Sequence, residues 1–271
     1  MSTINHSTIV ISGAASGIGR LLALEAAKKK AAYIVILDID EQAGLNVCNE
    51  IKTAGTDCSF VKVDLSNQFS IAQAVENIYA IVPSIDIVIN NAGIVTGKLF
   101  HDHLDVEIEN TIAINLNAPM YLTHKLLPGM LNKHAGHIVN VSSAAGMAAH
   151  PKLSVYAASK WGMIGWSESL RLELEQGNTG IKVTTVTPYY INTGMFKGVK
   201  SPIIPLLKPE VVAKKIIKAI EKNKIFSRMP GIVYAMPFFK GILPQRWFDA
   251  VVGKVFGVYG AMDFFKGREH N

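Results

Sequence analysis

Cysteine is scarce in this chain, and long apolar runs are missing. Only two of the 271 residues are cysteines, and the spacing of Cys48 and Cys58 matches neither a metal site nor a redox motif. So few thiols favour a reducing compartment. No apolar run reaches the roughly 18 uncharged residues of a membrane span, and the start, Met-Ser-Thr-Ile-Asn-His, lacks the basic and apolar regions of a signal peptide. We therefore expect a cytoplasmic protein.

Acidic residues are outnumbered by basic ones, 21 against 27, which gives a net charge of +6. A surface of solvated lysines explains this excess, and attraction to an anionic membrane surface is the alternative. No basic stripe is interleaved with aromatic residues, which argues against a nucleic-acid partner. His101 and His103 stand two apart without further ligands, so we expect no metal site.

Short apolar runs alternate with helical patterns through most of the chain. The predicted strands are residues 8–12, 33–37, 59–63, 85–89, 137–141 and 182–186, with an edge strand at 224–229. The predicted helices are residues 18–30, 41–54, 70–81, 106–131, 154–175 and 209–222. Strands that are apolar throughout and separated by helices indicate an α/β fold with a parallel sheet covered on both faces.

We predict a single dinucleotide-binding domain over residues 1–271, built on a doubly wound parallel sheet of the Rossmann type. Residues 1–195 would hold the cofactor and the catalytic groups. Residues 196–271 would form an apolar C-terminal extension that covers the substrate.

A glycine-rich loop follows the first predicted strand and opens the first helix. It contains Ser12, Gly13, Ser16, Gly17, Ile18 and Gly19. Glycines at such a turn let the backbone approach a pyrophosphate at the helix N-terminus. Because a strand precedes the loop and a helix follows it, the loop predicts a dinucleotide cofactor.

Asp38 ends the second predicted strand, 19 residues after Gly19. A carboxylate there accepts hydrogen bonds from the adenosine ribose and repels a 2′-phosphate. Ile39 follows it, and Ser16 stands where a basic residue would favour NADP, so we predict NAD. The alternative is that Asp38 caps the helix that starts at Glu41.

Polar turns also end the third and fourth strands. The first contains Asp64 and Leu65, and the second contains Asn91, Ala92 and Gly93. Because parallel strands present their carboxyl ends at one edge of the sheet, where ligands bind, we expect these residues to line the cofactor site too.

Ser143, Tyr156 and Lys160 stand at spacings that indicate one catalytic unit. Tyr156 and Lys160 are four apart, so they share one face of a helix. An ammonium beside a phenol should lower its pKa and let it exchange a proton with an alcohol or carbonyl. Tyr121 and Lys125 have the same spacing, but Ile108 stands where a serine would be needed. The serine therefore distinguishes the functional pair.

Together these residues resemble the short-chain dehydrogenase/reductase family over about residues 7–195. The resemblance implies that Tyr156 is the general acid/base, that Lys160 also binds the nicotinamide ribose, and that Ser143 positions the substrate oxygen. It further implies that Asn115 holds a water that links Lys160 to solvent. By analogy with the family, we expect a homodimer or homotetramer.

The segment after the sixth strand extends this resemblance and also departs from it. Pro188, Ile191 and Thr193 match positions near the cofactor. The family usually has glycine after this proline, whereas here Tyr189 follows and should reshape the substrate mouth. Residues 188–198 are similar to the branch that contains retinol and hydroxysteroid dehydrogenases.

The apolar C-terminal region bears on the substrate. With Tyr189, it predicts a small lipophilic alcohol or carbonyl: a retinoid, a steroid or a long-chain molecule. Residues 230–260 have three interpretations, namely core and dimer-interface packing, a substrate lid, or a peripheral surface that rests on a membrane.

Two other functions stay open at this point. One is a carbonyl reductase of the 3-oxoacyl type that uses NADPH. The other is a dinucleotide-binding protein without turnover, against which the set of Asn115, Ser143, Tyr156 and Lys160 argues.

Overall fold

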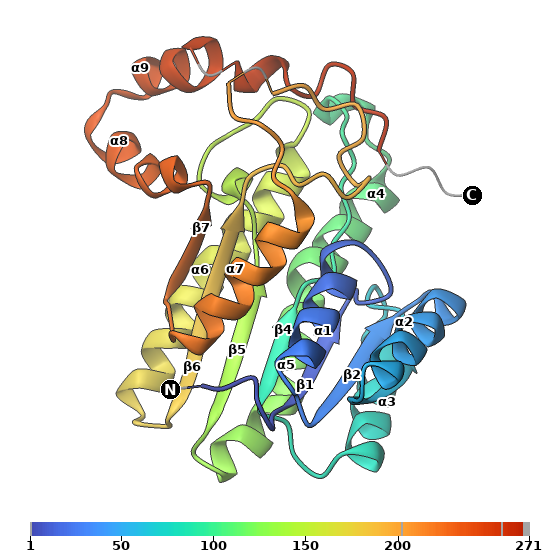
Figure 1. Ribbon diagram of the computed structural model, residues 1–271. Coiled ribbons are helices and arrows are strands. Elements are labelled where there is room, and N and C mark those ends of the chain that lie inside the picture. The colour runs from blue at the N-terminus through green and yellow to red at the C-terminus, as the bar shows by residue number, and fades with distance from the viewer. Residues whose placement is uncertain (1, 202, 256, 268–271) are drawn as a thin grey trace.

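A seven-stranded parallel sheet forms the centre of the computed structural model, which describes residues 2–201, 203–255 and 257–267. The strands lie in the order β3-β2-β1-β4-β5-β6-β7 (Figure 1), and each adjacent pair is parallel. Their bounds are β1 Thr8–Ser12, β2 Tyr33–Asp38, β3 Asp57–Lys62, β4 Ile87–Asn90, β5 Gly136–Val141, β6 Ile181–Pro188 and β7 Phe226–Met229. The predicted fold class is confirmed.

Helices cover both faces of the sheet (Figure 1). One face carries α1 (Gly17–Lys28), α2 (Glu41–Thr53) and α7 (Pro209–Glu221), and the other carries α3 (Gln68–Ile81), α5 (Ala118–Asn132) and α6 (Ser154–Gln176). Successive strand residues enter different cores: Ile9 packs in the first and Val10 in the second. This is why the strands are apolar at nearly every position.

The long helical pattern predicted at residues 106–131 is interrupted once. It consists of α4 (Asp105–Ile112), a π-helical stretch (Ala113–Asn117) and then α5. Short 3-10 segments occur at Phe100–Asp102 and Ala144–Gly146. The other predicted helices and strands are present, with ends that differ by at most two residues.

A buried polar network crosses the sheet behind its carboxyl edge. The Asn90 amide donates to Asn140 Oδ1 at 2.8 Å and to Thr123 Oγ1 at 3.0 Å. The Asn140 amide donates in turn to Ser167 Oγ at 2.8 Å. The network therefore joins β4 and β5 to α5 and α6.

The predicted C-terminal extension, residues 196–271, is not one separate layer, because α7 packs on the sheet and β7 is its edge strand. Only the part after β7, which we call the C-terminal extension, lies across the carboxyl end of the sheet (Figure 1). It contains a 3-10 turn (Gly231–Tyr234), α8 (Met236–Ile242), α9 (Gln245–Asp249), a π-helical stretch (Ala250–Val255) and a 3-10 turn (Val258–Gly260). Residues 202, 256 and 268–271 of the predicted extension lie outside the described residues. Among the helices in the described part of the chain, none has both the length and the apolar character needed to cross a bilayer.

Candidate active site

A cavity of about 820 Å³ lies at the carboxyl ends of the strands. It runs from the glycine-rich loop past α6 to the C-terminal extension. The predicted site residues that line it are Gly13, Ser16, Gly17, Ile18, Asp38, Asp64, Leu65, Asn91, Ala92, Gly93, Ser143, Tyr156, Lys160, Pro188, Ile191 and Thr193. The other predicted residues, Ser12, Gly19 and Asn115, lie behind this lining and support it.

The glycine-rich loop has the geometry that a dinucleotide phosphate requires. Gly13 has a φ of 65°, which favours glycine. A Cβ on Gly19 would come within 2.0 Å of the Gly13 carbonyl oxygen, so only glycine lets α1 begin this close to β1. The first turn of α1 is Gly17-Ile18-Gly19-Arg20, and its N–H groups and positive dipole end favour an anion. The loop therefore fits a pyrophosphate.

Ser12 and Asn91 fasten this loop to the end of β4. The Asn91 amide donates to the carbonyl oxygens of Ser12 at 3.0 Å and Gly13 at 3.1 Å. The Ser12 hydroxyl accepts hydrogen bonds from the N–H groups of Asn91 at 3.0 Å and Ala92 at 3.2 Å. Both side chains thus shape the loop, while Asn91 also lines the cavity.

Asp38 lies at the cavity, and the capping alternative for it is wrong. The carboxylate of Asp40, not that of Asp38, accepts a hydrogen bond from Ala43 N–H at 3.0 Å and caps α2. Asp38 accepts hydrogen bonds from the N–H groups of Ala15 at 2.9 Å, Ile39 at 2.8 Å and Asp40 at 3.2 Å. An ionised carboxylate has about four acceptor positions, so Asp38 is oriented by the backbone and keeps capacity for a ribose hydroxyl.

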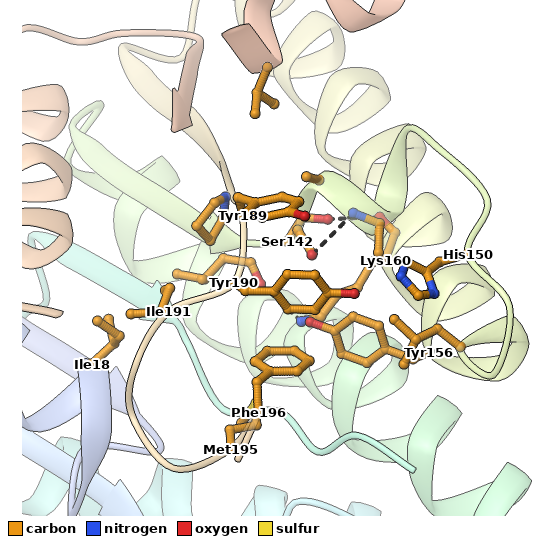
Figure 2. A pocket seen from close by; sticks show the side chains of 18 of the residues that line it. Ile18, Ser142, His150, Tyr156, Lys160, Tyr189, Tyr190, Ile191, Met195 and Phe196 are labelled. Carbon is orange, nitrogen blue, oxygen red and sulfur yellow. Dashed lines mark hydrogen bonds between the residues drawn. The ribbon is translucent and has the colours of Figure 1, made fainter. Parts of the chain in front are cut away.

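The catalytic candidates come together on one side of the cavity. Tyr156 and Lys160 lie one turn apart on α6, and both are buried. Ser143 follows β5, and its hydroxyl shares a hydrogen bond with Tyr156. The neighbouring Ser142 instead donates to the Lys160 carbonyl oxygen at 2.8 Å (Figure 2). Ser142 also lines the cavity, but its hydroxyl ties β5 to α6.

The pKa of Tyr156 shifts in the direction opposite to the one expected from the sequence. Burial raises it to about 12, and the hydrogen bond with Ser143 lowers it by a smaller amount. Burial also lowers the pKa of Lys160 to about 8. The Lys160 ammonium donates to the Val141 carbonyl oxygen at 3.0 Å. Desolvation therefore outweighs the attraction between ammonium and phenolate that the sequence argument assumed.

Asn115 lies in the π-helical stretch and is fully buried. Its Oδ1 accepts a hydrogen bond from Ile94 N–H at 2.8 Å, and its amide donates to the Ile94 carbonyl at 2.9 Å and to Ser159 Oγ at 3.2 Å. A Cβ on Gly93 would lie 3.2 Å from Asn115 Oδ1 and 3.5 Å from Lys160 Nζ. Asn115 thus supports the loop after β4 close to Lys160. Its implied water-holding role stays a prediction.

Aromatic side chains surround the phenol of Tyr156 (Figure 2). Ring centroids are 6.1 Å apart for Tyr156 and Phe196, 5.0 Å for Phe196 and Tyr190, and 4.7 Å for Tyr190 and Tyr189. His150 contacts Tyr190 edge-on at 6.1 Å. Sequence reasoning selected Tyr189 but missed Tyr190, Phe196 and His150. The run of aromatic residues after Pro188 was the available signal for the first two.

The outer part of the cavity is apolar and comes from the C-terminal extension. Its lining residues are Ile232, Val233, Ala235, Met236, Phe239, Ile242, Leu243, Phe248, Val251, Val252 and Val258. Lys240 fastens α8 to the rest of the molecule, because its ammonium lies 3.5 Å from the Trp161 ring centroid and donates to the Met147 carbonyl at 3.0 Å. The extension therefore contributes much of the apolar lining of the cavity that contains the catalytic candidates.

Comparisons of sequence point to one family. The family profile described as short chain dehydrogenase matches residues 7–203. The chain is 35% identical to human (Homo sapiens) epidermal retinol dehydrogenase 2 over 262 residues, which is 95% of this chain and 84% of that protein. It is 33% identical to rat (Rattus norvegicus) 17-beta-hydroxysteroid dehydrogenase 13 over 250 residues, covering 92% and 83%.

Comparisons of structure agree with the fold. A short chain dehydrogenase/reductase from Burkholderia phymatum in complex with NAD superposes with a TM-score of 0.80 at 22% identity, over 89% of this chain and 95% of that one. A metagenomic short-chain oxidoreductase in complex with NADP gives a TM-score of 0.71 at 28% identity, over 84% and 97%.

Proposed function

Since the chain belongs to the short-chain dehydrogenase/reductase family, in its retinol and hydroxysteroid dehydrogenase-like branch, and is therefore an NAD(P)-dependent oxidoreductase, we propose that it interconverts a lipophilic alcohol and its carbonyl with NAD(H). One observation carries this proposal. Ser143, Tyr156 and Lys160 lie in a single cavity between the glycine-rich loop on one side and an apolar extension on the other.

The chain's own residues supply the proton chemistry at this junction. Tyr156 gives a proton to a carbonyl oxygen or takes one from an alcohol. The Ser143 hydroxyl, which shares a hydrogen bond with Tyr156, holds the same substrate oxygen. Lys160 beside them favours the phenolate that forms when the proton leaves. A bound nicotinamide would supply or accept the hydride.

The preference for NAD rests on Asp38. One similar structure holds NAD and another holds NADP, so the comparisons support either nucleotide. A carboxylate that lines the cavity at the end of β2 repels a 2′-phosphate and accepts from a 2′-hydroxyl. Steady-state kinetics with both nucleotides test this choice. Clear selectivity for NADPH would instead favour the carbonyl reductase of the 3-oxoacyl type.

The lipophilic substrate class rests on the apolar lining and on Tyr189. The test is turnover, followed by NADH absorbance, with a panel of short polar and long apolar alcohols. We expect kcat/KM to rise with apolar size. A preference for short polar alcohols would overturn this part of the proposal.

For the assembly we propose a homodimer or homotetramer, by analogy with the family. Light scattering of the purified chain tests this.

A further inference from the structure

The exposed apolar residues of the C-terminal extension gather at one end of the molecule. On α8, Phe238 is 64% exposed, and on α9, Trp247 is 69% exposed. Ile232, Tyr234 and Ile242 are exposed in the same segment. Exposed aromatic residues this close together on short helices indicate a surface that another apolar phase covers.

The excess of basic residues is confined to the last third of the chain, which favours an anionic partner for this region. Residues 1–188 contain 13 basic residues (Lys and Arg) and 16 acidic residues (Asp and Glu), whereas residues 189–271 contain 14 basic and 5 acidic residues. The two segments 189–208 and 230–248, which lie at the carboxyl end of the sheet, contain five Lys and Arg and no Asp or Glu. Aromatic residues with basic residues among them are what an anionic lipid interface attracts.

The described acidic residues after Pro230 are Asp249 and Asp263, and both have partners. Asp263 forms an ion pair with Lys152 at 2.8 Å. Asp249 accepts hydrogen bonds from Gln245 at 2.8 Å and Tyr259 at 3.0 Å. Arg246, beside Trp247, is exposed, so a basic charge stands next to the most exposed aromatic ring of α9.

The cavity opens at the same surface. Phe239 and Ile242 both line it, yet they are 48% and 59% exposed. These side chains therefore form the rim, with one side toward the cavity and the other toward solvent. A lipid surface placed against α8 and α9 would meet this opening directly.

We propose that α8 and α9 dock peripherally on an anionic lipid bilayer, with Phe238 and Trp247 inserted at the headgroup level. The rim then faces the bilayer, and a lipophilic substrate passes between lipid and cavity without crossing water. This route of entry rests on the proposed function, whereas the docking itself does not.

Sedimentation of the full chain with lipid vesicles tests the docking without any need for turnover. We expect binding to vesicles of phosphatidylcholine and phosphatidylserine in equal parts, weaker binding to phosphatidylcholine alone, and further weakening by salt. The double variant Phe238→Ser with Trp247→Ser should lose roughly tenfold or more in partition, since it removes two inserted apolar side chains. Neither residue lines the cavity, and an unchanged circular dichroism spectrum and unfolding midpoint report that the variant is folded.

Two further variants make the test specific. Phe69→Ser removes an aromatic side chain that is 75% exposed on α3 and should leave vesicle binding unchanged. Arg246→Glu should weaken binding to the anionic vesicles roughly fivefold or more, whereas Lys52→Glu on α2 should have little effect.

Three outcomes would overturn the docking. In the first, the wild-type chain does not sediment with anionic vesicles. In the second, the Phe238 and Trp247 double variant binds vesicles as tightly as wild type. In the third, the double variant differs from wild type only in losing a concentration-dependent self-association. The last result would mean that a second copy of the chain covers this surface. A chain that binds vesicles but turns over no lipophilic alcohol would keep the docking and overturn the proposed function.

Discussion

The Lys160 ammonium lies 5.7 Å from the centroid of the Tyr156 ring, within one buried face of α6. Burial moves both groups toward their neutral forms, raising the pKa of Tyr156 to about 12 and lowering that of Lys160 to about 8. At neutral pH the phenol is therefore a proton donor, ready for carbonyl reduction.

Replacing Tyr156 by phenylalanine removes the hydroxyl and keeps the ring against Phe196. We expect kcat to fall roughly a hundredfold or more, because the proton transfer is lost, while nucleotide affinity, measured by fluorescence titration, changes little. Tyr121→Phe is the matched control, since it alters the other Tyr-x-x-x-Lys pair, on α5. Equal activity in the Tyr156 variant and wild type would contradict the mechanism.

The pH dependence should differ between the two directions of reaction. Alcohol oxidation needs the Tyr156 phenolate, and a pKa above the ordinary value keeps this form scarce at neutral pH. The kcat/KM for oxidation should therefore rise with pH, whereas that for reduction should not. Initial rates in both directions over a series of buffers check this. Oxidation that slows as the pH rises through the neutral range would argue against Tyr156 as the base.

Asp38→Asn should change the choice of nucleotide. Removing the carboxylate charge relieves the repulsion of a 2′-phosphate, so the kcat/KM ratio of NAD to NADP should fall by about tenfold, or ~1.4 kcal/mol. Asp40→Asn removes the same charge two residues away, where asparagine still caps α2, and should leave the ratio unchanged. An equal shift in both variants would show a general charge effect.

Tyr189→Ala should enlarge the substrate part of the cavity. The ring lines the cavity and its hydroxyl hydrogen-bonds Ser201 at 3.0 Å. We expect kcat/KM for bulky alcohols to rise several-fold relative to small ones, measured with a graded alcohol series. Tyr189→Phe, which keeps the ring and loses the Ser201 contact, should keep the wild-type order of preference. If both variants behave alike, the hydroxyl and not the ring sets the preference.

His137 should make stability depend on pH. It is fully buried in β5 between Ser2 Oγ at 2.9 Å and Thr184 Oγ1 at 2.8 Å. Burial, helped by the charge of Lys182, lowers its pKa from 6.5 to about 4. Between these values the unfolded chain binds a proton that the folded chain does not, so stability falls as the pH drops from 6.5 to 4.

Substitution of His137 by glutamine isolates this contribution. The free energy of unfolding of the wild type should lose roughly 3 kcal/mol more than that of the variant across this range, as measured by urea denaturation. His124→Gln, on the exposed part of α5, should keep the wild-type slope. Parallel curves for wild type and the His137 variant would contradict the assignment.

Local sequence was enough to predict the sheet and the nucleotide loop. Strands buried on both faces are apolar at successive positions, and the glycine-rich loop is one short segment whose constraints act within a few residues. The partners of Tyr156 could not be predicted in this way. Phe196 and Tyr190 come from the loop after β6, and His150, which contacts Tyr190, comes from the segment between β5 and α6. Only the folded chain shows which of many aromatic residues meet.

Electrostatics was the least predictable part of the site. The sequence places Lys160 one turn from Tyr156, but the pKa of each depends on how much water the surrounding chain excludes. The cap of α2 is a similar case at shorter range: Asp38 and Asp40 stand two residues apart, and backbone direction decides which one reaches Ala43. The spacing of residues along the chain therefore predicts neither these pKa values nor the residue that caps α2.

The asparagine network behind the site limits how the sheet can assemble. Strands of valine and isoleucine can slide past one another by two residues and still bury the same kind of side chain. Asn90 pairs with Asn140 in the register of β4 and β5, and a shifted pairing would break the buried hydrogen bond between their amides. The network therefore favours the native register of β4 and β5, the strand that leads into Ser143, over shifted registers during folding.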